Sequence, residues 1–99
     1  MRVKQHKTAD GRMILAVCDS ELIGKKFVEG DLQLDLSSDF YKGEDMEEER
    51  ILELFKVVHI VNLVGEKCVK LGIKAGIVDE DRVIKIKGIP HAEVVIVRD

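Results

Sequence analysis

The sequence has few cysteines, a single proline and no tryptophan among its 99 residues. Cys18 and Cys68 are far apart, so the chain lacks the Cys-x-x-Cys spacing that zinc knuckles and thioredoxin-like sites use. No apolar run approaches the roughly 18 residues that span a bilayer. No apolar stretch follows the basic start MRVKQHKT either, so we expect neither a membrane segment nor a signal peptide. These absences predict a cytoplasmic protein with reduced thiols.

Aromatic residues are also scarce, and the four present are Phe27, Phe40, Tyr41 and Phe55. They form no RNP-like strand or other nucleic-acid motif, and the net charge of −3 does not require a nucleic-acid partner. The histidines and cysteines come from different predicted elements and lack the paired spacing of metal ligands. We therefore predict no metal and no cofactor, while RNA binding stays open without a motif to support it.

Amide side chains are rare in a highly charged chain. Charged residues make up 35% of the sequence, whereas Asn62 is the single asparagine and Gln5 and Gln33 are the only glutamines. Many Glu, Lys and Arg with few amides are typical of heat-adapted proteins, so the composition predicts a thermophilic source. Sampling variation in a short chain is the alternative. The length suits one hydrophobic core, and we predict a single domain over residues 1–99.

The N-terminal half has the pattern of several short strands. Arg2–Thr8 alternates weakly and is followed by a turn at Ala9–Gly11. The apolar run MILAVC, Met13–Cys18, is typical of a central strand that is buried on both faces. Phe27–Val28 is a short extended piece, and Leu32–Leu36 alternates apolar and polar residues, as a strand with one wet face does.

Two helices are predicted to follow directly after one another. Asp45 occupies the capping position of the first, whose apolar residues fall at i, i+3, i+4 and i+7 from Ile51 to Val58. The β-branched run Val57–Val61 should end or bend this helix. Asn62 is a good cap for the second helix, which Gly76 ends from the C′ position.

A closing hairpin is predicted from Ile84–Ile86 and Ala92–Val97, with a turn at Gly88–Pro90. Because strands and helices are segregated along the chain, the pattern indicates an α+β fold rather than a doubly wound sheet. The predicted architecture is a single domain with an N-terminal β-hairpin in an antiparallel sheet, two consecutive helices and a C-terminal β-hairpin.

Reactive and charged residues gather directly after the buried strand, in the turn that runs from Asp19 to Lys26. Asp19, Lys25 and Lys26 are candidates for binding a ligand, although such a charge run is more often a solvated face. Cys18 would be a nucleophile if His91 supplied the base, which suggests a small hydrolase or transferase. An inert thiol in the core is the alternative, because cysteine is among the most buried residue types.

The start of the predicted second helix is another candidate site. Free backbone amides near Asn62 and Gly65 would attract an anion, and Gly65 would let a phosphate or a partner backbone approach closely. Tight helix packing is the alternative role for Gly65. His91 follows a rigid turn, where it could hydrogen-bond a ligand or stack on a base. Otherwise it only starts the last strand.

Four segments of the chain fit one recurrent pattern. They are LAVCDSELIGKKFVEGDLQLDL at 15–36, FYKGE at 40–44, IVNLVGEKCVKLGI at 60–73 and GIPHAEVV at 88–95. In this order they resemble a small archaeal family known only as domain of unknown function 424. The resemblance implies an archaeal cytoplasmic protein linked to the translation apparatus, with translation initiation factor 2 as a candidate partner. It assigns no catalytic residue. The positions that match its pattern are Cys18, Asp19, Gly24, Lys25, Asn62, Gly65, Pro90 and His91.

Our leading hypothesis is a non-enzymatic binding module that acts near ribosomes or translation factors. The contacts expected for such a module are Lys25, Lys26, Lys85, Lys87 and His91. The cysteine-dependent hydrolase or transferase that uses Cys18 and His91 is the alternative from another class. A homodimer held by the edge of the first strand is a third possibility.

Overall fold

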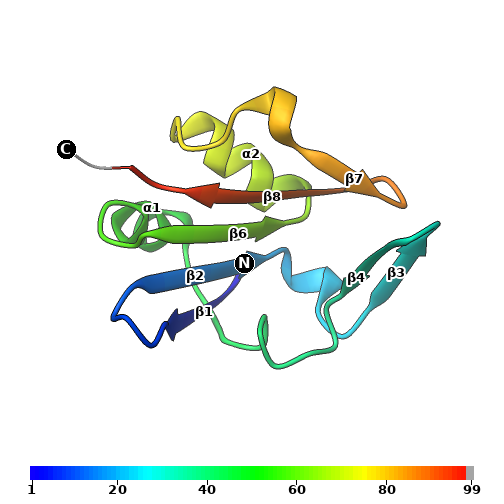
Figure 1. The fold of residues 1–99 in the computed structure, drawn as a ribbon, viewed down its shortest axis with the longest axis horizontal. Coiled ribbons are helices and arrows are strands. Elements are labelled where there is room, and N and C mark those ends of the chain that lie inside the picture. The colour runs from blue at the N-terminus through cyan, green and yellow to red at the C-terminus, as the bar shows by residue number, and fades with distance from the viewer. Residues whose placement is uncertain (98–99) are drawn as a thin grey trace.

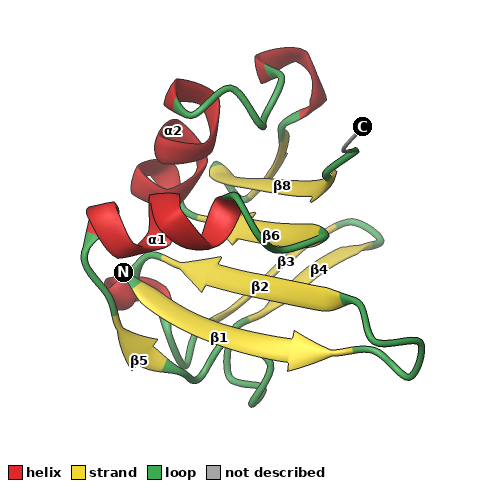
Figure 2. Cartoon of the chain, turned by 90° about the vertical axis from the view of Figure 1, so that its left-hand side faces the viewer, coloured by secondary structure: helices red, strands yellow, loops and turns green. Residues whose placement is uncertain are grey.

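The computed structural model describes residues 1–97, which form a six-stranded sheet, a separate two-stranded hairpin and two α-helices. The strands are β1 (Arg2–Lys7), β2 (Met13–Cys18), β3 (Lys26–Glu29), β4 (Leu32–Asp35), β5 (Glu44–Asp45), β6 (Ile60–Val64), β7 (Ile84–Ile86) and β8 (Ile89–Val95). The helices are α1 (Glu48–Phe55) and α2 (Glu66–Lys74), and short 3-10 turns lie at Ser20–Leu22 and Glu80–Arg82. The large sheet has the order β5-β1-β2-β6-β8-β7, and β3 pairs with β4 (Figure 1 and Figure 2).

Both α-helices lie on one face of the large sheet, and Figure 2 shows the β3–β4 hairpin on the other side. The helix side holds the larger core. Leu15 and Val17 of β2 and Leu63 of β6 are fully buried there, together with Ile51 of α1 and Cys68 of α2. Because successive strand residues point to opposite faces, the intervening residues of β2 and β6 face away from the helices.

The opposite face of the sheet, which we call the hairpin face, has a smaller core. Ala16 and Cys18 of β2 and Val64 of β6 are buried there with Leu34 of β4 and Leu36 just after it. The hairpin covers only part of this face. Further along, side chains of β1, β6 and β8 on the same face remain partly exposed.

Strand β6 occupies the place where the second helix was predicted to start. It pairs in parallel with β2 and antiparallel with β8, in the middle of the sheet. The two helices are therefore not consecutive, and the prediction that Asn62 caps a helix is wrong. Val61, Leu63 and Val64 are all buried although they point to both faces, and β-branched residues suit such a strand better than a helix. The helical periodicity belongs to α2, which begins only at Glu66.

Helix α1 also begins later than predicted. Asp45 is not its cap but lies in β5, where it pairs with Arg2 of β1. Glu47 is the N-cap residue of α1, and its side chain makes no capping hydrogen bond. The predicted end is confirmed, because the helix stops at Phe55, before the β-branched run Val57–Val61. Strand β5 thus covers the first part of the outer edge of β1, the edge considered above for a homodimer.

The C-terminal hairpin forms as predicted, but its turn lies earlier. Lys87 and Gly88 make the turn, with φ angles of 53° and 77°. Pro90 lies inside β8, opposite Lys85 of β7, so the predicted turn at Gly88–Pro90 is wrong. Pro90 has no N–H to donate to the sheet, but its carbonyl accepts a hydrogen bond from the Gly65 N–H at 2.9 Å.

The predicted α+β class is confirmed, with strands at both ends of the described chain. Strands β1 and β2 form the predicted N-terminal hairpin, and β2 is the central buried strand that its apolar sequence indicates. Within residues 1–97, neither helix is long and apolar enough to cross a membrane.

Candidate functional site

Asp19 lies directly after β2 and is buried, with only 3% of its surface exposed. Its carboxylate accepts hydrogen bonds from the first turn of α2: Oδ2 from the Lys67 N–H at 3.0 Å and Oδ1 from the Cys68 N–H at 2.9 Å. The Asp19 N–H donates to the Val64 carbonyl of β6 at 3.0 Å. Because the first amides of a helix have no partner within it, Asp19 caps α2 from a distant part of the chain. Its contacts hold β2, β6 and α2 together.

Gly65 joins β6 to α2 and is the N-cap residue of the helix, with φ of 109°. A Cβ at this position would lie 2.3 Å from Asp19 Cγ, so only glycine leaves room for that carboxylate. The group that Gly65 allows to approach is therefore part of the protein itself. This arrangement matches the packing role considered for Gly65 rather than an anion site.

Both cysteines are free and fully buried. Burial, together with the negative charges of Asp19 and Glu21, raises the pKa of the Cys18 thiol to about 12. The Cys18 thiol donates a hydrogen bond to the Asp19 carbonyl at 3.4 Å. Burial also raises the pKa of the Cys68 thiol. Since the thiolate is the nucleophile, these surroundings oppose the activation that a catalytic cysteine needs.

Cys18 and His91 lie on the same face of the sheet but not side by side. Cys18 is opposite Val64 of β6, and Val64 is in turn opposite His91 of β8. Two strand spacings separate the two backbones, or about 10 Å, with a buried valine between them. A base that activates a thiol has to lie within hydrogen-bond reach of it, roughly 3 Å.

The His91 imidazole has an unpaired nitrogen. Its Nε2 is buried and has no hydrogen-bond partner among residues 1–97. Burial lowers the pKa of His91 below its usual value, and the nearby Glu93 carboxylate partly opposes that shift. The ring is therefore mainly neutral near pH 7.

Asn62 is close to His91 and Glu93 on the hairpin face. It is half-buried, and Glu93 lies directly opposite it on β8. The hydrogen bonds from the Gly65 N–H to the Pro90 carbonyl and from the Ile96 N–H to the His59 carbonyl fix the alternation of this ladder. They make Asn62 and Glu93 a non-hydrogen-bonded pair with Cα atoms about 4.5 Å apart. Within residues 1–97 the Asn62 side chain makes no hydrogen bond.

Tyr41 borders the same group from the loop that follows the hairpin. Its ring is buried, with its edge against Phe40 at 5.0 Å between centroids. Burial raises the pKa of the Tyr41 hydroxyl to about 12, with Cys18 and Glu93 adding to the shift. Tyr41 belongs to the same small core as Val64, which lies directly opposite His91 of β8. We call Tyr41, Asn62, His91 and Glu93 the hairpin-face cluster.

Besides Asp19 and Gly65, the structure brings two further predicted binding residues together and adds two that sequence reasoning missed. Asn62 and His91 were predicted for different reasons, and pairing of β6 with β8 places them on one face. The sequence contains a sign of Glu93: it lies two residues from His91 on a predicted strand, so the two side chains share one face of the sheet. The sequence contains no such sign of Tyr41, because the position of this residue depends on the path of a loop.

The four lysines predicted as contacts are exposed but spread out. Lys25 and Lys26 lie at the start of β3, whereas Lys85 and Lys87 belong to β7 and its turn. The backbone N–H of Lys87 donates to Glu29 Oε1, at the other end of β3, at 2.6 Å. About 10 Å of strand therefore separates Lys26 from the Lys87 backbone.

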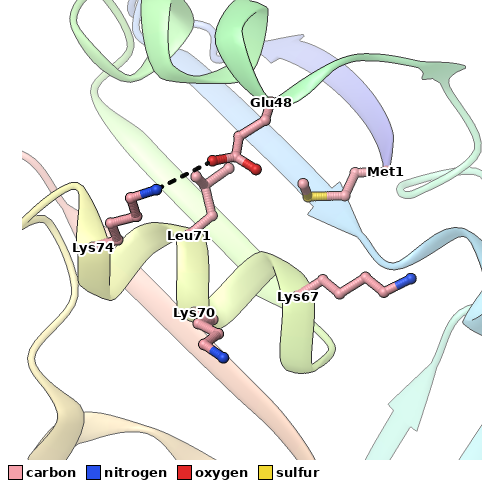
Figure 3. A pocket seen from close by; sticks show the side chains of 6 residues that line it. All are labelled: Met1, Glu48, Lys67, Lys70, Leu71 and Lys74. Carbon is pink, nitrogen blue, oxygen red and sulfur yellow. Dashed lines mark ion pairs between the residues drawn. The ribbon is translucent and has the colours of Figure 1, made fainter.

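A row of lysines on α2 was also missed. Lys67, Lys70 and Lys74 lie at i, i+3 and i+7, and Figure 3 shows them along one side of the helix. Their spacing is the signal in the sequence, because residues three and four apart share a helix face. Over residues 1–97, no group of three or more His, Cys, Asp or Glu side chains converges to hold a metal ion.

These features define a small α+β domain in which a buried aspartate ties the central parallel strands to a helix, and in which one sheet face is partly open. The chain belongs to the family described as protein of unknown function DUF424, whose model matches residues 6–97. The predicted family is confirmed. No curated protein matches the chain.

The fold is similar to that of a solved structure, the crystal structure of an uncharacterized conserved protein from Methanopyrus kandleri. The two are 28% identical, with a TM-score of 0.80, and the match covers 99% of this chain and 93% of that chain.

Proposed function

We propose that this protein is a non-enzymatic binding module of the archaeal cytoplasm that associates with the translation apparatus, through the ribosome or a translation initiation factor. The observation that carries the binding role is the unpaired, buried Nε2 of His91 within the hairpin-face cluster. The resemblance to the family supports the link to translation. The structural neighbour from Methanopyrus kandleri supports an archaeal source, and two free cysteines suit a reducing compartment.

An unpaired buried nitrogen is unfavourable in the free protein. Leaving a buried polar group without a hydrogen bond costs about 1–3 kcal/mol, and most such groups in folded proteins are paired. Because Nε2 is buried, a ligand reaches it only when the ring or a neighbouring side chain moves, and the hydrogen bond formed then recovers this free energy. His91 and the neighbouring Asn62 amide are therefore suited to recognising a polar group on a partner.

Binding is better supported than catalysis by the same residues. The hydrolase or transferase alternative needs a Cys18 thiolate next to a base, whereas burial raises the pKa of Cys18 to about 12. His91 is two strands away from it. The hairpin-face cluster offers donors and acceptors but no activated nucleophile.

Sedimentation and pull-down test this function. The purified protein is centrifuged with archaeal ribosomes at low salt, and a tagged form is used to capture translation initiation factor 2. We expect the wild-type protein to appear in the ribosome pellet or the factor complex. The His91→Phe variant keeps the ring shape without the nitrogens, and we expect it to bind more weakly. Absence of association in both assays would contradict the proposal.

A further inference from the structure

The lysine row on α2 lies on the opposite side of the sheet from the hairpin-face cluster. Lys67, Lys70 and Lys74 line a surface pocket together with Leu71, Met1 and Glu48 of α1 (Figure 3). At 1.5 Å of helix rise per residue, the three lysines span about 10.5 Å along the axis of α2. They form a line of positive charge on a chain whose net charge is −3.

The charges of this row are only partly neutralised. Lys74 Nζ lies 3.8 Å from Glu48 Oε1, which is an exposed ion pair. Lys67 also lines a neighbouring pocket that contains Glu21 and Glu66. Lys67 forms no ion pair within residues 1–97. Lys70, at the centre, forms none among the same residues either, although Glu66 lies four residues before it on the same helix.

The floor of the pocket is apolar. Leu71 is 4% exposed and belongs to the core, and the Met1 side chain lies beside it. The lysines themselves remain exposed, and the Lys74 side chain is 78% exposed. Their charges are therefore accessible to a ligand and sensitive to salt.

We propose that the Lys67–Lys70–Lys74 row binds consecutive phosphates of a nucleic-acid strand. The spacing of about 3.4 Å per nucleotide holds along the axis of a duplex, and consecutive phosphates of one strand lie further apart because the strand winds around that axis. A row of about 10.5 Å therefore faces about two consecutive phosphates. Lysine binds phosphate as a point charge, without the planar fork with which arginine recognises single carboxylates. A line of lysines without arginine therefore suits a phosphate backbone better than an acidic peptide. This surface is separate from the hairpin-face cluster and does not depend on the proposed function.

Fluorescence anisotropy with a labelled oligouridylate, and with the matching oligothymidylate, tests the proposal. The test variant is Lys67→Gln/Lys70→Gln/Lys74→Gln. The control is Lys7→Gln/Arg12→Gln/Lys56→Gln, which removes the same charge from exposed positions that have no part in either proposed surface. Circular dichroism confirms that both are folded, and single Lys70→Gln serves if the triple variant is not.

We expect wild type and control to bind with a log Kd that rises with log salt, at a slope of about 0.7 per phosphate contacted. The test variant should lose about tenfold or more in affinity at low salt, with a slope reduced by one to two contacts. Equal affinity for the RNA and DNA probes would show that the protein binds the phosphate backbone. A higher affinity for RNA would show an additional contact to the 2′-hydroxyl of the sugar.

Three results would overturn the proposal. The first is no binding of the wild-type protein at low salt. The second is an equal loss in the test and control variants, because the α2 row would then have no special role. The third is equally tight binding of poly-glutamate of the same charge, which would identify an acidic protein as the partner.

Discussion

Replacing Asp19 by alanine tests whether this residue holds the fold together. The change removes the acceptor of two hydrogen bonds, at 3.0 Å from Lys67 N and 2.9 Å from Cys68 N. A hydrogen bond to a charged group contributes about 1.5–3 kcal/mol. The pocket beside Asp19 allows some water to replace the carboxylate. We therefore expect a loss of about 2–4 kcal/mol in the free energy of unfolding, below the sum of two full bonds.

The control for this variant is Asp79→Ala. Asp79 also caps a helical turn, because its carboxylate accepts a hydrogen bond from Asp81 N–H at 3.1 Å, but it is exposed. An exposed cap contributes about 0.5–1 kcal/mol. Asp19→Asn keeps one acceptor oxygen and should fall between the two, which provides a folded variant if Asp19→Ala does not fold.

Urea denaturation followed by circular dichroism measures the difference, with equal m-values showing that the unfolded states are comparable. For a domain of this size, a loss of 2–4 kcal/mol lowers Tm by roughly 10 to 30 °C. If Asp19→Ala destabilises the protein no more than Asp79→Ala does, Asp19 is not a structural cap. Asp19 would then again be a candidate for binding a ligand.

Three further predictions follow from the geometry of the same region. Gly65→Ala should lower the free energy of unfolding by at least about 2 kcal/mol, because its Cβ would meet the Asp19 carboxylate at a φ that L-residues avoid; urea denaturation no different from wild type would refute this. His91→Phe should stabilise the free protein by about 1 kcal/mol, since it removes an unpaired buried nitrogen. Burial lowers the pKa of His91 in the folded protein, so around and below about pH 6.5 the unfolded state binds more protons than the folded state does. The free energy of unfolding of the wild-type protein should therefore fall as the pH drops through that region. His91→Phe should lose this part of the pH dependence, and identical pH profiles would contradict it. Cys18 and Cys68 should react with a thiol reagent at pH 8 only after unfolding, and rapid labelling of Cys18 in the folded protein would instead favour the cysteine-dependent enzyme.

Local patterns predicted the parts of the fold that depend on local interactions. The apolar run Met13–Cys18 indicated a central strand, and the β-branched run Val57–Val61 indicated the end of α1; both were correct. The strand β6 was missed because its residues flank a helical pattern, and only pairing with β2 and β8 shows that they are extended. Pairing between strands distant in the sequence is a tertiary effect that periodicity does not reveal.

In the candidate site too, local patterns identified single residues but not the contacts between them. Asp19 and Gly65 were both singled out from sequence, but their meeting depends on two parallel strands ending at the same edge of the sheet. The sequence carries no sign that one occupies the space left by the other. The composition also predicted heat adaptation, which stays a prediction, because the four ion pairs between described residues share no residue and so form no network.

The most direct test of the proposed binding module compares two amide variants in the ribosome sedimentation assay. Asn62→Ala removes the amide of the hairpin-face cluster, and Gln33→Ala removes an exposed amide of β4 as a control. Both variants should remain folded. We predict that Gln33→Ala sediments with ribosomes as wild type does, whereas the bound fraction of Asn62→Ala falls several-fold, in line with about 1 kcal/mol for a lost hydrogen bond. Equal sedimentation of the two variants would contradict a role for the hairpin-face cluster in binding.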